Sequence, residues 1–264
     1  MISTKALKVV YRPINVEALS DVTLEIPLQT TTCIVGPNAS GKTTLLRALA
    51  GLVEYEGAVF IDGKEARELG KELRKILAYT APFTTSDLLG VRVLDVLLTS
   101  RYPVSPGLVD REEDVSVIYK VAEALGVHRL LERRVNELSS GEAQRVLIAA
   151  ALVREPRILL LDEPDSHLDV STKPRLSQLL KELSEKCTVI LSTHDPLFAF
   201  YTCKYFIVLS RGKVLYVGYL DDILENLAPL EKAFGVKFAK VNFNGVEVPV
   251  PLYSAHSAEP SEGD

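Results

Sequence analysis

The chain has 264 residues, of which 47% are hydrophobic and 25% are charged, with a formal net charge of -5. This composition predicts a globular protein with one large domain, and the absence of any stripe of lysine and arginine excludes a nucleic-acid-binding surface. The longest apolar run, at residues 146–153, is far shorter than the roughly 18 residues of a membrane span, and the first residues do not begin a signal peptide. We therefore expect a cytoplasmic protein.

Three cysteines lie far apart in the sequence, at Cys33, Cys187 and Cys203. Their odd number and apolar neighbours predict reduced thiols in the core. Their spacing matches no metal site, so we expect neither a metal cluster nor a disulfide.

The first segments in chain order predict a β-ribbon. Residues 5–11 and 22–26 have the composition of two short strands, joined through Pro13 and Asn15. Tyr11 lies at the end of the first strand. Its ring could stack on a purine base or fill the core as a buried strand tyrosine, and the residues alone favour neither.

A phosphate-binding loop follows at residues 36–43, which match the pattern G-x-x-x-x-G-K-[ST]. An apolar strand at residues 32–35 precedes the loop and an amphipathic helix at 44–50 follows it, a context that a chance glycine-rich turn would lack. Lys42 is expected to reach the β- and γ-phosphates, and the Thr43 hydroxyl to bind Mg²⁺. The predicted nucleotide-binding residues of this segment are Gly36, Pro37, Asn38, Ala39, Ser40, Gly41, Lys42, Thr43 and Thr44.

Between Pro82 and Pro156 the pattern changes from strands to helices. One helix is predicted after a capping box that begins at Asp110. A second helix runs to Val153 and begins with small and polar residues, at Ser139, Ser140, Gly141 and Glu142. Such a helix start offers N–H donors to an anion, although taken alone it is typical of an ordinary helix cap.

A continuous apolar run at residues 158–161 ends in two acids, Asp162 and Glu163. Such a run predicts a strand buried on both faces of a parallel sheet, and ligands bind at the carboxyl ends of these strands. Asp162 is placed to hold Mg²⁺ and Glu163 to polarise an attacking water, whereas the alternative is a strand closed by two solvated acids. A buried strand at 189–192 leads to His194 at the same sheet edge, where a phosphate contact is favoured over a structural role.

In this order and spacing, the segments resemble the ATPase subunit of ATP-binding cassette (ABC) transporters. Residues 36–43 are similar to its Walker A motif, 138–142 to its signature sequence and 158–163 to its Walker B motif. Asp169 lies in a segment similar to its D-loop, His194 is similar to its switch histidine, and Tyr11 to its adenine-stacking aromatic residue. The resemblance covers about residues 3–225.

The residues and the resemblance together predict an α/β fold. We expect a phosphate-loop NTPase core with a mainly parallel sheet, an N-terminal antiparallel β-ribbon and an inserted helical subdomain. The expected ABC ATPase domain spans residues 1–253, with the helical subdomain at about 83–156 and a C-terminal extension at about 229–253. An Asn244-Gly245 turn predicts a hairpin in the extension, and the composition of residues 254–264 predicts a disordered tail.

The resemblance implies an ATP hydrolase that uses ATP and Mg²⁺ to drive transport. Lys42, Glu163 and His194 would be catalytic. Two copies, or this chain and a second cassette ATPase, would face each other head to tail, each nucleotide being completed by the partner's signature residues, which correspond to Ser139, Ser140, Gly141 and Glu142. The helical subdomain would bind an integral-membrane permease on the inner face of the membrane, and an extracellular substrate-binding protein would act indirectly.

Short segments, including Arg101-Tyr102-Pro103, resemble the subfamily that imports iron-siderophores, haem and cobalamin. One alternative is a soluble ABC ATPase without a transporter, although such proteins usually carry two cassettes or long insertions that this chain lacks. Another is a phosphate-loop kinase or a binding module without turnover, which requires the signature to be accidental.

One departure from the family concerns the junction between the core and the helical insert. The resemblance places Pro82 where the family has a glutamine that senses Mg²⁺ and the attacking water. Proline offers no side-chain donor or acceptor. The nearest polar replacements are Thr84, Thr85, Ser86 and Asp87.

Overall fold

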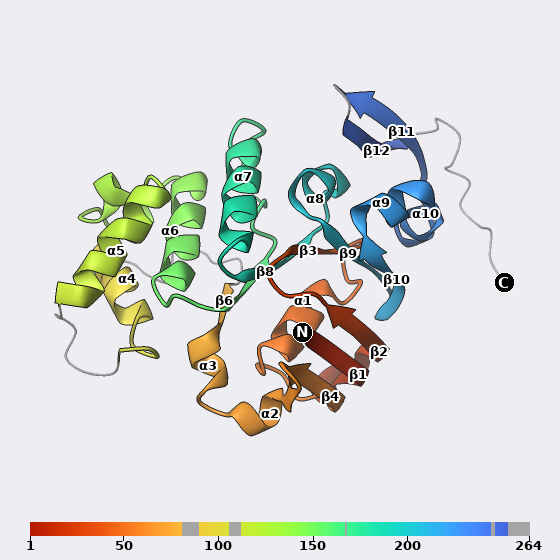
Figure 1. The fold of residues 1–264 in the computed structure, drawn as a ribbon, viewed down its shortest axis with the longest axis horizontal. Coiled ribbons are helices and arrows are strands. Elements are labelled where there is room, and N and C mark those ends of the chain that lie inside the picture. Colours follow the sequence, from red (N-terminus) through yellow and green to blue (C-terminus); the bar gives the residue numbers. More distant parts are fainter. Residues whose placement is uncertain (81–89, 106–111, 167, 244–245, 253–264) are drawn as a thin grey trace.

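The computed structural model describes residues 1–80, 90–105, 112–166, 168–243 and 246–252. The Pro82 junction with its polar neighbours, the helix cap at Asp110, the Asn244-Gly245 turn and the expected tail at 254–264 lie outside these residues. The strands form a six-stranded, a four-stranded and a two-stranded sheet, and Figure 1 shows helices grouped around them.

A six-stranded sheet forms the centre of the molecule (Figure 1). Its strands, in spatial order, are β10 (Lys213–Tyr219), β9 (Tyr205–Ser210), β3 (Thr31–Val35), β8 (Thr188–Thr193), β7 (Ile158–Asp162) and β6 (Leu77–Thr80). All neighbours are parallel except β10, which is antiparallel to β9. Every residue of β3, β7 and β8 is buried, as continuous apolar runs predict for a sheet covered on both faces.

The register of this sheet aligns the ends of three strands. Val35 of β3 lies opposite Thr193 of β8, and Asp162 of β7 lies opposite Ser192 of β8. The segments that leave these strands therefore start at one edge of the sheet, which is where the sequence predicted the functional residues.

A four-stranded antiparallel sheet lies beside the first. Its order is β2 (Val16–Ile26), β1 (Ile2–Tyr11), β4 (Glu56–Ile61) and β5 (Lys64–Glu65), with the 3₁₀ turn η1 (Arg12–Ile14) between β1 and β2. β1 and β2 are longer than the expected strands. Register shifts between Thr4 and Leu7, and positive φ angles at Ala6 (47°) and Asp21 (50°), interrupt the alternation of side chains from which strands are predicted.

Helix α1 (Lys42–Leu49) links the two sheets. Its buried Leu45, Leu46 and Leu49 share a hydrophobic cluster with Leu7 of β1 and Leu160 of β7. The short helices α2 (Ala66–Leu69) and α3 (Leu73–Ile76) follow β5 and lead into β6. The helix that starts at the phosphate-binding loop is thus anchored against both sheets.

Three helices gather beyond β6, on the side drawn in yellow and green in Figure 1: α4 (Val93–Ser100), α5 (Glu112–Ala124) and α6 (Ser140–Leu152). The 3₁₀ turns η3 (His128–Leu130) and η4 (Val135–Glu137) connect α5 with α6. Buried Arg101, which follows α4, pairs with Asp114 of α5 at 2.5 Å and donates to the carbonyl of Val153 at the end of α6. This pair joins the three helices into one unit.

The remaining helices are α7 (Lys173–Ser184), α8 (Pro196–Thr202), α9 (Leu220–Glu225) and α10 (Ala228–Phe234). The first three each precede or follow a strand of the six-stranded sheet, whereas α10 leads from α9 to the terminal hairpin. The expected terminal hairpin is present and consists of β11 (Lys237–Phe243) and β12 (Val246–Leu252). β12 contacts α8, and one side chain of each strand, Phe238 and Val248, is buried. In the described residues, no helix has both the length and the apolar character that crossing a membrane requires.

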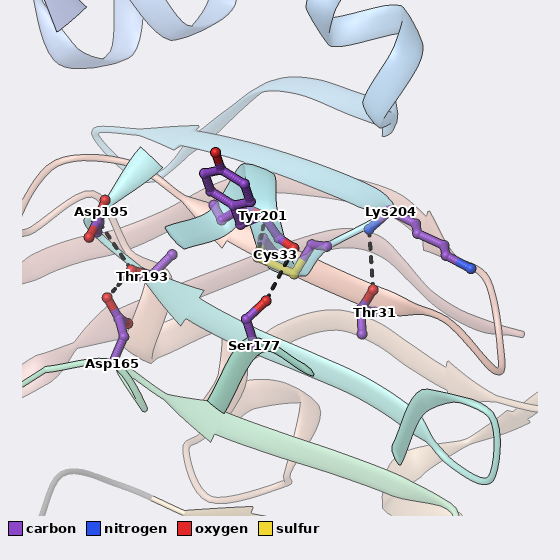
Figure 2. The surroundings of a disulfide bond; sticks show 10 residues. Thr31, Cys33, Asp165, Ser177, Thr193, Asp195, Tyr201 and Lys204 are labelled. Carbon is purple, nitrogen blue, oxygen red and sulfur yellow. Dashed lines mark hydrogen bonds between the residues drawn. A yellow bond between two sulfur atoms is a disulfide. The ribbon is translucent and has the colours of Figure 1, made fainter. Parts of the chain in front are cut away.

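The prediction of three reduced cysteines is wrong for two of them. Cys33 of β3 and Cys203, directly after α8, form a disulfide with a Cα–Cα distance of 5.8 Å (Figure 2). They are 170 residues apart, so their spacing carried no information about the contact that the fold creates. Cys187 is free and buried, and burial raises the pKa of its thiol to about 11.

Replacing both cysteines, Cys33→Ala together with Cys203→Ala, is expected to lower the free energy of unfolding by about 2–5 kcal/mol, because the bond closes a long loop in the unfolded chain. Chemical denaturation under non-reducing conditions measures the change. Cys187→Ala is the matched control and should leave the effect of a reducing agent on stability intact. Detection of three free thiols in the parent protein after denaturation would contradict the disulfide.

Candidate functional site

The phosphate-binding loop turns between β3 and α1 and wraps around the side chain of Lys42. The Lys42 Nζ donates hydrogen bonds to the carbonyls of Gly36 (2.9 Å) and Pro37 (3.0 Å). Gly41 has a φ of 105°, and a Cβ there would lie 2.8 Å from the carbonyl oxygen of Ala18. The loop needs glycine at this position because a side chain would meet the backbone of β2.

A cavity of about 460 Å³ opens above this loop. That volume lies in the range of small-molecule sites. The predicted residues that line it are Tyr11, Asn38, Ala39, Ser40, Gly41, Lys42, Thr43, Thr44 and Glu163. A larger cavity of about 780 Å³ lies near the C-terminal end of α1, but none of the predicted site residues lines it.

Two lining residues that the sequence analysis missed come from the turn between β9 and β10, Arg211 and Gly212. Gly212 donates its N–H to the carbonyl of Ser40 (3.0 Å) and accepts a bond from the N–H of Ser20 (2.9 Å). The positive φ angles of Arg211 (47°) and Gly212 (74°) are those of a tight hairpin turn. The sequence could indicate such a turn, but not its contact with the phosphate-binding loop.

Tyr11 lies at the same cavity, at the end of β1. Its side chain is partly buried, and its hydroxyl is 3.3 Å from the Thr44 Oγ1. The ring is therefore held beside the start of α1, where it lines the cavity.

Three hydroxyl groups surround the carboxylate of Asp162, which is 3% exposed. Thr43 (3.0 Å) and Ser192 (2.6 Å) donate to its Oδ1, and Tyr79 (3.2 Å) donates to its Oδ2. Both oxygens of this buried carboxylate therefore have hydrogen-bond donors, which fix its orientation. The sequence pointed to Thr43 but not to Ser192 or Tyr79, which come from neighbouring strands.

Glu163 lies between two groups that can carry positive charge. Its Oε1 is 3.8 Å from the Lys42 Nζ, and its Oε2 is 3.5 Å from the His194 Nδ1. Its own N–H donates to the Ser192 Oγ (3.0 Å). Burial lowers the pKa of Lys42, and the carboxylates of Glu163, Asp162 and Asp165 oppose that shift. The structure thus brings Lys42, Asp162, Glu163 and His194 together at one sheet edge.

The signature residues form a helix cap at the start of α6. Ser139 is the N-cap residue: its Oγ accepts the N–H of Glu142 (3.3 Å), and its own N–H donates to the Glu142 carboxylate (2.9 Å). The bond from the Ser139 backbone lowers the pKa of Glu142 despite some opposing burial. Neither of these residues, nor Ser140 or Gly141, lines the cavity above the phosphate-binding loop.

Asp169 closes the turn before α7. Its Oδ1 accepts bonds from the Ser171 hydroxyl (2.7 Å) and from the N–H and hydroxyl of Thr172 (both 2.8 Å). These donors lower the pKa of Asp169. Like the signature, Asp169 is absent from the lining of the cavity.

A strand, phosphate-binding loop and helix, with an acid pair at the end of a second parallel strand, define a phosphate-loop nucleoside triphosphatase. Comparison with known proteins places the chain within this class. A family model described as ABC transporter matches residues 19–166, more than half of the chain.

The most similar curated proteins include two ATP-binding subunits. The uncharacterized ABC transporter ATP-binding protein MJ0873 of Methanocaldococcus jannaschii is 33% identical over 85% of this chain and 78% of its own length. The ferric enterobactin transport ATP-binding protein FepC of Escherichia coli is 32% identical over 88% of both chains. The dimeric structure of the ATP-binding cassette MJ0796, bound to ADP and Pi, is 30% identical, with a TM-score of 0.73 over 83% of this chain and 99% of that chain.

The chain therefore belongs to the ABC transporter family. It is an ATP-binding subunit whose hydrolysis of ATP is coupled to transport, and the predicted fold class is confirmed.

Ser192→Ala tests the hydroxyl that joins the two acids. The change leaves Asp162 without its shortest hydrogen bond and the N–H of Glu163 without its acceptor. Loss of a group that orients site residues typically costs roughly 10–100-fold, so we expect the kcat for ATP hydrolysis to fall by about that factor. Steady-state kinetics measures it. Ser184→Ala, at a buried serine that donates to the Lys181 carbonyl, is the control; equal rates in the two variants would contradict the role of Ser192.

Proposed function

We propose that this chain is the ATP-hydrolysing subunit of an importer of iron-chelate or cobalamin-type solutes. The observation that carries the hydrolytic part is the carboxylate of Glu163, which lines the phosphate-loop cavity and lies 3.8 Å from the Lys42 Nζ and 3.5 Å from the His194 Nδ1. The solute class is supported by the likeness to FepC, a ferric enterobactin transport protein, and by the subfamily segments near Arg101.

The site residues take roles that follow from their positions. The phosphate-binding loop and Lys42 bind the β- and γ-phosphates, and Tyr11, which lines the same cavity, stacks on the base. Glu163 polarises the attacking water. His194 stabilises the charge that develops on the γ-phosphate. Its imidazole lies 3.5 Å from Glu163, and its side chain is half exposed.

The side-chain oxygens of Thr43 in α1 and Asp162 at the end of β7 fit Mg²⁺. This ion prefers oxygen ligands, and the Thr43 Oγ1 and the Asp162 Oδ1 lie 3.0 Å apart beside the phosphate-binding loop. Among the described residues no group of three or more His, Cys, Asp or Glu side chains could hold a metal by itself, which suits an ion that keeps waters and binds phosphate oxygens. Mg²⁺ supplies charge neutralisation on the phosphates, and Thr43 and Asp162 would hold it.

Two copies are needed to complete the nucleotide site in this proposal. Ser139, Ser140, Gly141 and Glu142 carry a helix start with backbone donors, yet none lines the cavity of its own chain. A second chain in head-to-tail orientation would bring its signature residues, and the turn at Asp169, to that cavity. The dimeric, nucleotide-bound cassette that this chain resembles supports such a pair.

The helices α4 to α6 are the proposed permease-binding part of a single ATPase domain at residues 1–253. The buried pair of Arg101 and Asp114 makes these helices one unit with the signature helix, so a change at the nucleotide would move the permease-binding surface as well. The chain would lie on the inner face of the membrane through that permease. An extracellular substrate-binding protein would supply the solute to the permease.

The proposed membrane permease is tested by affinity purification of the tagged chain from solubilised membranes. Recovery of no membrane protein would contradict this partner. Recovery of an integral-membrane permease, stable to washing with salt, is the result expected for the transporter subunit.

Glu163→Gln is expected to keep ATP binding, to reduce steady-state hydrolysis by at least about 100-fold and to accumulate an ATP-bound dimer. An amide has nearly the same shape as the carboxylate but cannot polarise water. Size-exclusion chromatography with ATP and Mg²⁺ measures the dimer. Glu182→Gln on α7 is the control and should behave like the parent. A Glu163→Gln variant that stays monomeric and hydrolyses ATP at a rate near that of the parent would overturn the assignment.

A further inference from the structure

A second polar group, with three charged residues and one threonine, lies near the proposed site and is not used by the proposed chemistry. It comprises Asp165, Lys173, Thr193 and Asp195. Asp165 is 2% exposed, and its Oδ2 accepts the hydroxyl of Thr193 at 2.9 Å. Figure 2 shows Asp165, Thr193 and Asp195 in a row. The bond from Thr193 joins the first two, and a bond from the Asp195 N–H to the Thr193 Oγ1 joins the last two.

The Lys173 ammonium links the two carboxylates. Its Nζ donates to the Asp195 Oδ2 at 2.6 Å and lies 3.7 Å from the Asp165 Oδ2. Burial lowers the pKa of Lys173, but the hydrogen bond and charge of Asp195 outweigh it, so the net shift is upward. Burial raises the pKa of Asp165, whose Oδ1 has no hydrogen-bond partner among the described residues. Without Lys173, two carboxylates would face each other in a mostly buried place.

This group holds the chain on both sides of His194. Thr193 precedes the histidine and is bound to Asp165, while Asp195 follows it and donates its N–H to the Thr193 Oγ1 at 3.0 Å. Asp195 also accepts the N–H of Phe198 at 3.2 Å, which caps α8. Each neighbour of His194 is therefore fixed by at least one bond to the group.

The imidazole of His194 has much less support of its own. Its side chain is 51% exposed, and its Nδ1 lies 3.5 Å from the Glu163 Oε2. Packing therefore covers only part of the ring. Its distance from Glu163 thus depends on the backbone of residues 193–195, which the charged group fixes.

We infer that Lys173 and Asp165 are positioning residues that set the place of His194 beside Glu163. The inference rests on the proposed role of His194 in ATP hydrolysis. Lys173 is the first residue of α7, directly after the turn closed by Asp169, so the same side chain ties that turn to the segment after β8.

A double-mutant cycle tests the inference on the full chain. Lys173→Met removes the charge and keeps the length of the side chain. In the parent background, kcat for ATP hydrolysis should fall by roughly 10-fold or more, with KM changed less than about threefold. In a His194→Ala background, the same change should lower kcat by less than about twofold, because the residue it positions is already absent.

Further variants separate positioning from folding. Lys173→Arg should recover most of the activity, because it restores the bond to Asp195. Thr193→Val, nearly isosteric, removes the hydroxyl that joins Asp165 to Asp195 and should reproduce the cycle if Lys173→Met does not fold. Lys181→Met, two turns further along α7 and exposed, is the matched control and should leave kcat within about twofold.

The outcomes are distinct. Equal losses of kcat from Lys173→Met in both backgrounds would overturn the inference, since the residue would then act independently of His194. A loss from His194→Ala with none from Lys173→Met or Thr193→Val would overturn the inference and leave the proposed function standing. An unchanged kcat in His194→Ala itself would show that His194 takes no part in ATP hydrolysis. That result would overturn the proposed role of His194 and, with it, the inference about Lys173 and Asp165.

Discussion

The alignment of three strand ends is the constraint on which the site depends. β3, β8 and β7 are parallel neighbours, and their register places Val35 beside Thr193 and Ser192 beside Asp162. The phosphate-binding loop, the acid pair and the histidine follow these strands. Residues more than 100 positions apart therefore meet because the backbone ladder leaves no other register.

Two hydroxyl groups of β8 then form hydrogen bonds that hold the acids and the histidine segment in place. Ser192 is bonded at once to the carboxylate of Asp162 and to the N–H of Glu163, and Thr193 is bonded to Asp165 and Asp195. Two consecutive residues of β8, with side chains on opposite faces of the strand, thus bind the acids Asp162 and Glu163 on one side and the segment around His194 on the other. Both are buried, so each bond is shielded from water.

The sequence predicted those parts of the structure that depend on local pattern. The buried strands β3, β7 and β8 have continuous apolar runs, and the loop at residues 36–43 has a pattern tied to its backbone geometry, so their place at the sheet edge could be inferred. The length of β1 could not, because bulges such as that at Ala6 interrupt its alternation.

Contacts created only by the tertiary fold were also missed. The disulfide of Cys33 with Cys203 joins residues 170 apart, and no spacing rule reaches that far. Tyr79 and Ser192 look like ordinary strand residues until β6, β7 and β8 lie side by side. The cap at Ser139 was predicted as a helix start, whereas its role in a second chain rests on the family resemblance and stays a proposal.

In the proposed dimer, nucleotide is held between the phosphate-binding loop of one chain and the signature residues of the other. Two variants test this arrangement. Each carries one introduced cysteine, Asn38→Cys in the first and Ser139→Cys in the second, in a Glu163→Gln background that keeps the Cys33–Cys203 disulfide, and the two have different tagged masses. They are mixed with a short bismaleimide cross-linker, with and without ATP and Mg²⁺. We expect a cross-linked dimer that contains one chain of each variant and forms only with ATP. A third variant carries both cysteines in one chain. If the two separate variants give no mixed product while this third variant cross-links within a single chain, the head-to-tail dimer is contradicted.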